Sequence, residues 1–490
     1  MHPEGSSGTG QRRGSVLRNT FFLAVAETAG RVVSLVFFTL AARHLGVVRF
    51  GILSFSLAFV SMFSVLSDLG IGTLAIREIA RDRSAAPDLV RRGISIRLLA
   101  STVVTLVVVA AAALLAYPVA TVCVVAICST TVVSGGVILF YASVLQGFEH
   151  NSYTALARAA QTAVMVAGAL LLARQTAPAV AGYALVLAGA SMIAAMAVSV
   201  VVWVKFVPLS LDFDFRRWLP MLRRAVPFGV TTILVAFYYW SGSTILSKMA
   251  GQKAVGEFGA AFRLVAGVGF LGASFSGAVY PVISRVFATE PSRWPATAGR
   301  ALRLILNLAV PQAMLGFTLA GPVIGILYGR GYEGSVPVMM ALAWWGACAT
   351  LNSMLSSMLF ATDRQRIVTV QAGISVAVSV VLNLALIPVL GALGAAIALS
   401  AAEAAGTAFL FVSCYKTSTS WRPAGVVPSI ARAGVAAGAA AVAAMLCARW
   451  NPWVGIALAL PAYATLLVLC GGVQPEDVET VRLALRRVSV

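Results

Sequence analysis

The chain of 490 residues is 60% hydrophobic, has a mean hydropathy of +0.91 and carries a formal net charge of +19. This composition excludes a soluble globular domain of that length. The positive charge is spread over many short connections and does not form one basic arm. It therefore favours contact with anionic membrane lipid, and no nucleic-acid partner is predicted.

Fourteen apolar stretches follow one another from Asn19 to Gly472. Each is long enough to cross a bilayer core about 30 Å thick. We therefore predict an all-α polytopic membrane protein with about 14 transmembrane helices. The predicted spans are 19–42, 51–71, 98–116, 119–145, 153–173, 179–204, 226–247, 255–284, 304–327, 336–361, 367–387, 391–415, 430–449 and 452–472.

Arginine and lysine concentrate on alternate connections between these stretches. The basic segments precede the first span and then lie at 77–97, 205–224, 285–303, 364–366, 416–422 and 482–487. By the positive-inside rule, both termini are predicted to be cytoplasmic, in the cell membrane. The first stretch is too long for a signal peptide and contains Glu27 and Arg31, so cleavage there is not expected.

The connections on the predicted outer face are too short to hold a catalytic domain. The chain has no phosphate-binding glycine loop of the Walker type, and its six cysteines show no metal-type spacing with the three histidines. We therefore expect a protein that is not an enzyme, with no catalytic residue, cofactor or metal. Coupling of its function to a proton or sodium gradient remains open.

Two similar segments indicate an internal repeat. The pairs Phe50-Gly51 and Phe258-Gly259 lie 208 residues apart, and the same offset relates Asn19 to Pro227. Parallel repeats related by an axis along the membrane normal are typical of transporters with a substrate site between the halves. The predicted parts are a cytoplasmic tail (1–18), a six-helix bundle (19–204), a cytoplasmic interfacial linker (205–225), a second six-helix bundle (226–415), two additional helices (430–472) and a cytoplasmic tail (473–490).

The linker between the halves allows two interpretations. Phe215, Trp218, Leu219 and Leu222 recur at helical spacing beside arginines, as in a helix that lies on the inner leaflet. A solvated linker with some apolar anchoring is an equal alternative, because Pro220 fits only near a helix start or at a kink.

Several short motifs, in their order along the chain, resemble the oligosaccharide flippase branch of the polysaccharide transporter family, within the superfamily of multidrug, oligosaccharidyl-lipid and polysaccharide exporters. These motifs are Ala42–Gly51, Asp68–Gly72, Arg77–Arg81, Val255–Arg263, Tyr280–Ser284, Leu327–Tyr332 and Ile387–Ala396. The resemblance implies two bundles around a central cavity, two extra C-terminal helices, and outward flipping of an undecaprenyl-pyrophosphate-linked oligosaccharide by alternating access.

Three arginines lie away from the ends of predicted spans, and an unpaired charge near the centre of a span costs about 2.5–3.5 kcal/mol on insertion scales. They are Arg31, Arg158 and Arg263. Guanidinium groups make bidentate contacts with phosphate oxygens, so all three are candidate substrate-binding residues. Arg31 and Arg263 are preferred, because the resemblance to lipid II flippases implies cavity arginines on the first and eighth helices. Arg158 is close enough to the inner surface to snorkel.

Three carboxylates are candidates for a coupling site or a structural ion pair. Glu27 lies four residues before Arg31 on the same helical face, which suits an intrahelical pair. Glu403 lies in the middle of a span, on a face of small residues. Asp68 lies near the predicted inner end of its span, where capping or gating is the expected role.

Tyr239 is a candidate for stacking on a sugar ring. It belongs to an aromatic cluster in the seventh span, and the alternative for this cluster is an interfacial aromatic belt. The function predicted from all these features is translocation of a polyprenyl-linked oligosaccharide, with a glycan polymerase or glycosyltransferases as partners. The alternatives are a cation-coupled multidrug exporter and a membrane enzyme of glycan assembly.

Overall fold

A computed structural model describes residues 8–68, 70–150, 152–175, 179–208, 210–417 and 426–472. Side chains are described within these ranges except at 8–29, 217, 223–231 and 417. Helices account for nearly all of the described residues, among which no β-strand occurs. The prediction of an all-α polytopic membrane protein is therefore confirmed.

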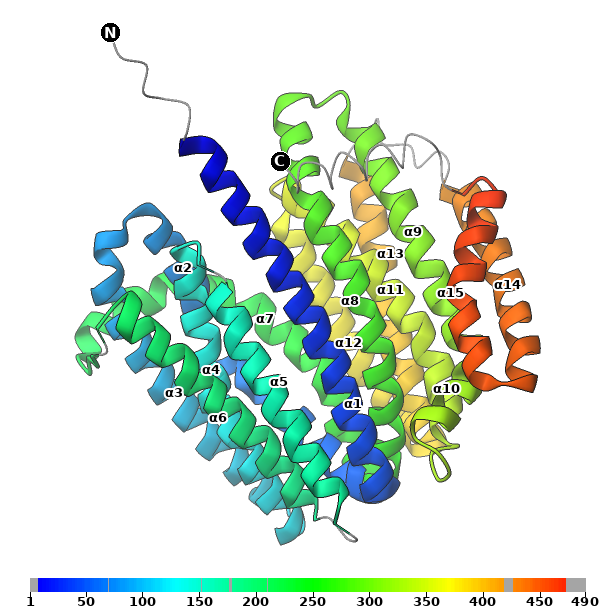
Figure 1. The fold of residues 1–490 in the computed structure, drawn as a ribbon, viewed down its shortest axis with the longest axis horizontal. Helices are drawn as coiled ribbons and strands as arrows, with labels where there is room; N and C mark the ends of the chain where they lie inside the picture. The colour runs from blue at the N-terminus through cyan, green and yellow to red at the C-terminus, as the bar shows by residue number, and fades with distance from the viewer. Residues whose placement is uncertain are drawn as a thin grey trace. The chain divides into compact units, whose positions relative to one another are not determined.

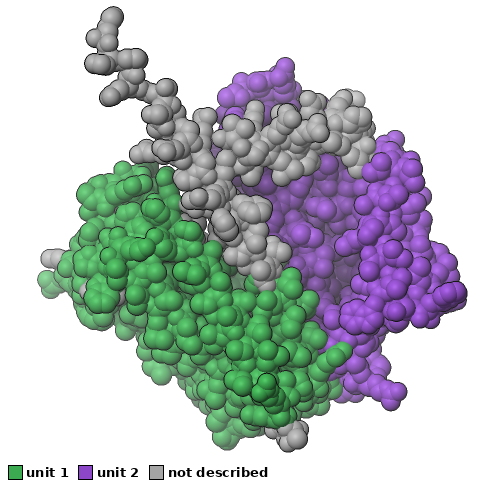
Figure 2. Space-filling model, viewed as in Figure 1, with its two compact units in different colours: residues 1–241, 488–490 green, residues 242–487 purple. Residues whose placement is uncertain are grey.

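The chain divides into two compact units, coloured separately in Figure 2. Unit 1 comprises residues 1–241 with 488–490, and unit 2 comprises residues 242–487. The helices that begin in unit 1 are α1 (Gly8–Ser64), η1 (Val65–Ser67), α2 (Ile71–Arg81), η2 (Arg83–Ala85), α3 (Ala86–Leu114), α4 (Val119–Gly147), α5 (Ser152–Ala173), α6 (Val180–Lys205) and α7 (Phe215–Met249).

Unit 2 contains the end of α7 and eight further helices. They are α8 (Gly251–Thr289), α9 (Trp294–Thr318), α10 (Ala320–Leu327), α11 (Ser335–Ala361), α12 (Gln365–Leu390), α13 (Ala392–Thr417), α14 (Val426–Trp450) and α15 (Pro452–Leu469). The α3 and α9 helices begin 208 residues apart, which is the offset that relates the two Phe-Gly pairs.

Twelve helices of the described chain are long and apolar enough to cross a membrane. The first of these, Gly30–Ser67, includes parts of the first two predicted spans, 19–42 and 51–71, and Gly46 lies in the connection predicted between them. Gly46 has φ +70°, a conformation that glycine adopts without steric cost, and it breaks the helical geometry of α1 there. The predicted seventh span falls in α7, and the predicted ninth is divided between α9 and α10.

Two segments differ from their predictions. The connection after the second span contains α2, and α3 begins at Ala86, so Arg97 lies inside a helix and not in a basic loop. The described residues of the linker form no separate interfacial helix. Residues 206–208 and 210–214 are not helical, and from Phe215 the chain continues without a break into α7, with Pro220 near its start.

Each unit has its own apolar core. In unit 1, α4 packs between α3 and α6, and α1 packs against α5 (Figure 1). In unit 2, α11 occupies the corresponding central position and packs against α8, α9 and α13. The α14 and α15 helices pack on each other through small residues such as Ala437 and Ala441, and α14 also contacts α9. These cores hold the polar side chains described next at fixed positions.

Candidate functional site

An ion pair joins Asp68, the residue that follows η1, to the middle of α3. Arg97 donates from Nη1 to Oδ1 of Asp68 over 2.6 Å. The side chain of Arg97 is 3% exposed, whereas that of Asp68 is 40% exposed. A charge within a membrane-spanning helix requires such a partner. Asp68 was predicted as a capping or gate residue, and the structure gives it this ion pair with Arg97.

Arg97 reaches Asp68 along a face of α4 that lacks a side chain at Gly136. A Cβ atom at Gly136 would lie 2.9 Å from Nε of Arg97 and 2.8 Å from Oγ of Ser101. Neither Nε of Arg97 nor Oγ of Ser101 has a hydrogen-bond partner in the described part of the chain. The glycine therefore provides the space that the guanidinium group occupies.

Replacing Gly136 with alanine is expected to destabilise the protein by about 1–3 kcal/mol, because overpacking forces Arg97 or Ser101 to move. Gly135 provides a matched control, since a Cβ there meets nothing within 4 Å. Gly135→Ala should be neutral or slightly stabilising, as expected for glycine to alanine within a helix. Thermal unfolding of both variants in detergent tests the difference, and equal unfolding temperatures would contradict it.

Two predicted arginines of unit 1 lie on helices that pack together. Arg31 is exposed on α1, and Arg158 is half-buried on α5. Gly30, the residue before Arg31, faces α5, because a Cβ atom there would lie 3.7 Å from Oγ1 of Thr162. Thr162 lies one helical turn after Arg158 on α5. The side chain of Glu27, the predicted partner of Arg31, lies outside the described residues.

The other two predicted substrate residues lie next to aromatic side chains. Arg263 is half-buried on α8 in unit 2. Its neighbour Phe262 packs on Trp345 of α11, with ring centroids 5.1 Å apart. Tyr239 is half-buried on α7, and its ring meets that of Tyr238 edge-on at 5.1 Å. Both side chains are partly accessible, which a substrate-binding role requires.

Glu403 is a buried carboxylate of unit 2. Its side chain is 3% exposed, and Nδ2 of Asn352 on α11 donates to Oε1 of Glu403 over 2.6 Å. This contact joins α11 to α13. A carboxylate held by an amide in a low-dielectric interior can either fix two helices or exchange a proton or cation, depending on its charge state.

A row of polar contacts continues from this carboxylate through the interior of unit 2. Thr350 donates to Oε1 of Gln312 over 2.8 Å and thereby links α11 to α9. The hydroxyls of Ser276 and Ser353 lie 2.8 Å apart and link α8 to α11. Unit 2 therefore has a polar centre in which α11 contacts three other helices.

Sequence reasoning missed Arg97, Asn352 and Gln312. Arg97 was assigned to a basic connection because the apolar window begins at Leu98. Asn352 and Gln312 could have been found from the sequence, since each is a polar residue within a long apolar run. Among the described residues, no group of three or more His, Cys, Asp or Glu side chains is arranged to hold a metal ion.

A model of the family described as "Polysaccharide biosynthesis protein" matches residues 16–287, more than half of the chain. No curated protein matches the sequence. The fold is similar to that of the lipid II flippase MurJ in an inward closed conformation, with a TM-score of 0.72 and 13% identity over 91% of this chain and 98% of that one.

Multidrug transporters of the MATE family share the fold as well. An inward-facing structure matches with a TM-score of 0.62 and 12% identity over 80% of this chain and 96% of the other. An outward-facing structure matches with a TM-score of 0.55 and 14% identity over 84% and 98% of the two chains. These similarities show that the chain shares its fold with these proteins.

Proposed function

Because the chain belongs to the polysaccharide biosynthesis protein family, we propose that it is a flippase that moves a polyprenyl-pyrophosphate-linked oligosaccharide across the cytoplasmic membrane by alternating access. The family match over residues 16–287 is the observation that carries this proposal. The fold shared with a lipid II flippase supports it, as do the twelve helices of the described residues that are long and apolar enough to cross a membrane.

In this proposal the arginines bind the charged part of the substrate. Arg31 and Arg263 contact pyrophosphate oxygens, for which the guanidinium group supplies planar, paired donors. Arg158 adds a third positive charge, and Tyr239 stacks on a sugar ring. The polyprenyl chain stays in the bilayer, and a glycan polymerase or glycosyltransferases act on the same lipid-linked substrate.

A flipping assay in proteoliposomes tests the proposal. The substrate is a fluorescent undecaprenyl-pyrophosphate oligosaccharide, and its loss from one leaflet is followed with a membrane-impermeant quencher. If the protein is a flippase, its presence should make more of the fluorescent substrate accessible to the quencher. Efflux of lipophilic cations without flipping would favour the multidrug exporter, and extension or transfer of the glycan would favour an enzyme.

We further propose that Glu403 couples transport to a proton or sodium gradient. Replacing it with glutamine removes the charge but keeps an oxygen that accepts the hydrogen bond from Asn352, so stability should change by no more than about 1 kcal/mol. Transport by Glu403→Gln should no longer respond to an imposed gradient. Glu290→Gln, in an exposed ion pair with Arg293, is the matched control. A retained gradient response in Glu403→Gln would contradict the coupling role.

A further inference from the structure

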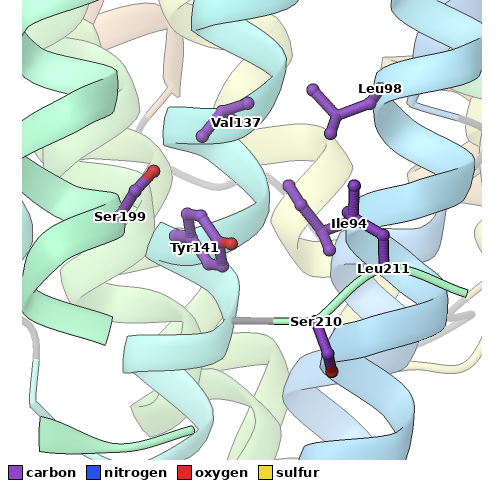
Figure 3. Close-up of a pocket in the computed structure, with 7 residues that line it drawn as sticks. All are labelled: Ile94, Leu98, Val137, Tyr141, Ser199, Ser210 and Leu211. Atoms are coloured by element: carbon purple, nitrogen blue, oxygen red, sulfur yellow. The ribbon is translucent and has the colours of Figure 1, made fainter. Parts of the chain in front are cut away.

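The two units hold carboxylates in their interiors in different ways. In unit 1, a groove of about 540 Å³ lies between α3, α4 and α6 (Figure 3), and none of the seven residues drawn there carries a charge. The carboxylate of Asp68 is neutralised by the permanent charge of Arg97. In unit 2, the buried carboxylate of Glu403 faces the neutral amide of Asn352. An amide, unlike a guanidinium group, can bond a carboxyl group in both of its charge states.

The α13 helix is held on α11 by contacts other than that of Glu403. Three side chains of α13, spaced seven residues apart, donate to backbone carbonyl oxygens of α11. They are Ser400 to Ala341 over 2.9 Å, Thr407 to Cys348 over 3.3 Å and Cys414 to Leu355 over 3.9 Å. Each donor lies 59 residues after its acceptor, so these contacts form one regular seam along the two helices. A purely structural role of Glu403 as the link between the helices is therefore redundant.

The amide of Asn352 offers Glu403 two different atoms. Its Nδ2 donates to Oε1 of Glu403 over 2.6 Å, which suits a charged carboxylate. Its Oδ1 is buried and has no hydrogen-bond partner in the described part of the chain. A half-turn about the Cβ–Cγ bond exchanges the two atoms. Oδ1 then faces Glu403 and accepts a hydrogen bond from the O–H of a protonated carboxyl group. One amide can thus serve both charge states of the buried carboxylate.

The atoms around this pair favour a proton over a metal cation. A hard metal cation binds through several oxygen ligands at once. The amide presents a donor to Glu403, and the nearby carbonyl oxygen of Cys348 already accepts a hydrogen bond from Thr407. The described residues contain no group of three or more His, Cys, Asp or Glu side chains that could hold a metal ion. A proton needs one donor and one acceptor, which Glu403 and Asn352 provide.

We propose that Glu403 binds and releases a proton, and that Asn352 is the positioning residue for both states of its carboxyl group. When Oε1 of Glu403 takes up one proton from the aqueous phase, the N–H···Oε1 bond breaks. The amide turns, and the new O–H group donates to Oδ1 of Asn352. Release of the proton reverses these steps. This inference rests on the coupling role proposed for Glu403 and identifies the coupled ion as a proton.

Infrared difference spectroscopy tests the proposal without a transport assay. Full-length protein in nanodiscs is recorded at acidic and at alkaline pH, and the carbonyl stretch of protonated carboxyl groups is compared between the unaltered protein and Glu403→Gln. The band that the unaltered protein gains on acidification should lose one component, that of Glu403, in the variant. The measurement needs no substrate, so its result is separate from whether the protein flips a lipid-linked oligosaccharide.

Variants of Asn352 separate its positioning role from simple packing. Asn352→Leu removes both the donor and the acceptor, so the Glu403 component should shift to the frequency of a carboxyl group whose O–H has no acceptor. Asn352→Gln keeps both atoms and should move the component back towards its original frequency. Ser400→Ala removes a hydrogen bond of the seam but none of Glu403. It is the matched control and should leave the component in place.

Three results would overturn the proposal. If Glu403→Gln loses no component of the band, Glu403 does not exchange a proton. If the component disappears when sodium replaces choline at constant pH, the site takes a metal cation. If Asn352→Leu and Ser400→Ala both leave the frequency unchanged, Asn352 has a packing role alone. Size-exclusion chromatography in detergent checks that each variant is folded.

Discussion

Replacing Asp68 with asparagine is expected to lower the free energy of unfolding by about 3–5 kcal/mol, the cost of leaving a buried charge without its partner. The charge that remains is that of Arg97, whose side chain is only 3% exposed. Arginine cannot lose its proton to escape this environment. The variant should therefore unfold at a markedly lower temperature in detergent than the unaltered protein.

The reverse replacement should be milder. Arg97→Met leaves the charge on Asp68, which is 40% exposed and can be hydrated, so we expect a loss of about 1–3 kcal/mol. The double variant Asp68→Asn with Arg97→Met should be more stable than Asp68→Asn alone, because it contains no unpaired buried charge. Thermal unfolding of all three variants measures this coupling. Equal effects of the two single replacements, or a double variant that is the least stable, would contradict it.

The sequence predicted the membrane spans well because a bilayer requires long apolar runs, and hydropathy measures these runs directly. It predicted helix ends poorly. The α3 helix begins at Ala86, with Pro87 in its first turn, twelve residues before the apolar window that marks it. Hydropathy reports where a helix meets hydrocarbon and not where the helix starts, so the buried position of Arg97 was not visible from the sequence.

In the candidate site, the sequence predicts which residues are unusual but not which residues they contact. A charge within an apolar run, such as Glu403, can be recognised from its neighbours in the sequence. Its partner cannot, because Asn352 lies 51 residues away and the contact depends on how α11 and α13 pack. The same is true of Asp68 and Arg97, which are separated by 29 residues.

Arg263→Ala is expected to lower the rate of flipping at least about thirtyfold, because truncating one partner of a desolvated, hydrogen-bonded charge pair costs 2–5 kcal/mol or more. Arg263 is half-buried on α8, between the buried side chains of Phe262 and Leu264. The two neighbours keep the helix packed, so the variant should remain folded. The proteoliposome assay measures the rate, and size-exclusion chromatography in detergent checks the fold.

Arg263→Lys separates charge from geometry in the same assay. Lysine keeps the positive charge but lacks the planar fork that contacts two phosphate oxygens at once, so flipping should be intermediate between that of Arg263→Ala and the unaltered protein. Arg330→Ala, at an exposed position between α10 and α11, is the matched control and should leave the rate of flipping unchanged. Full flipping by Arg263→Ala would remove Arg263 from the binding site. Equal losses in Arg263→Ala and Arg330→Ala would show that overall positive charge, and not a phosphate contact at α8, drives transport.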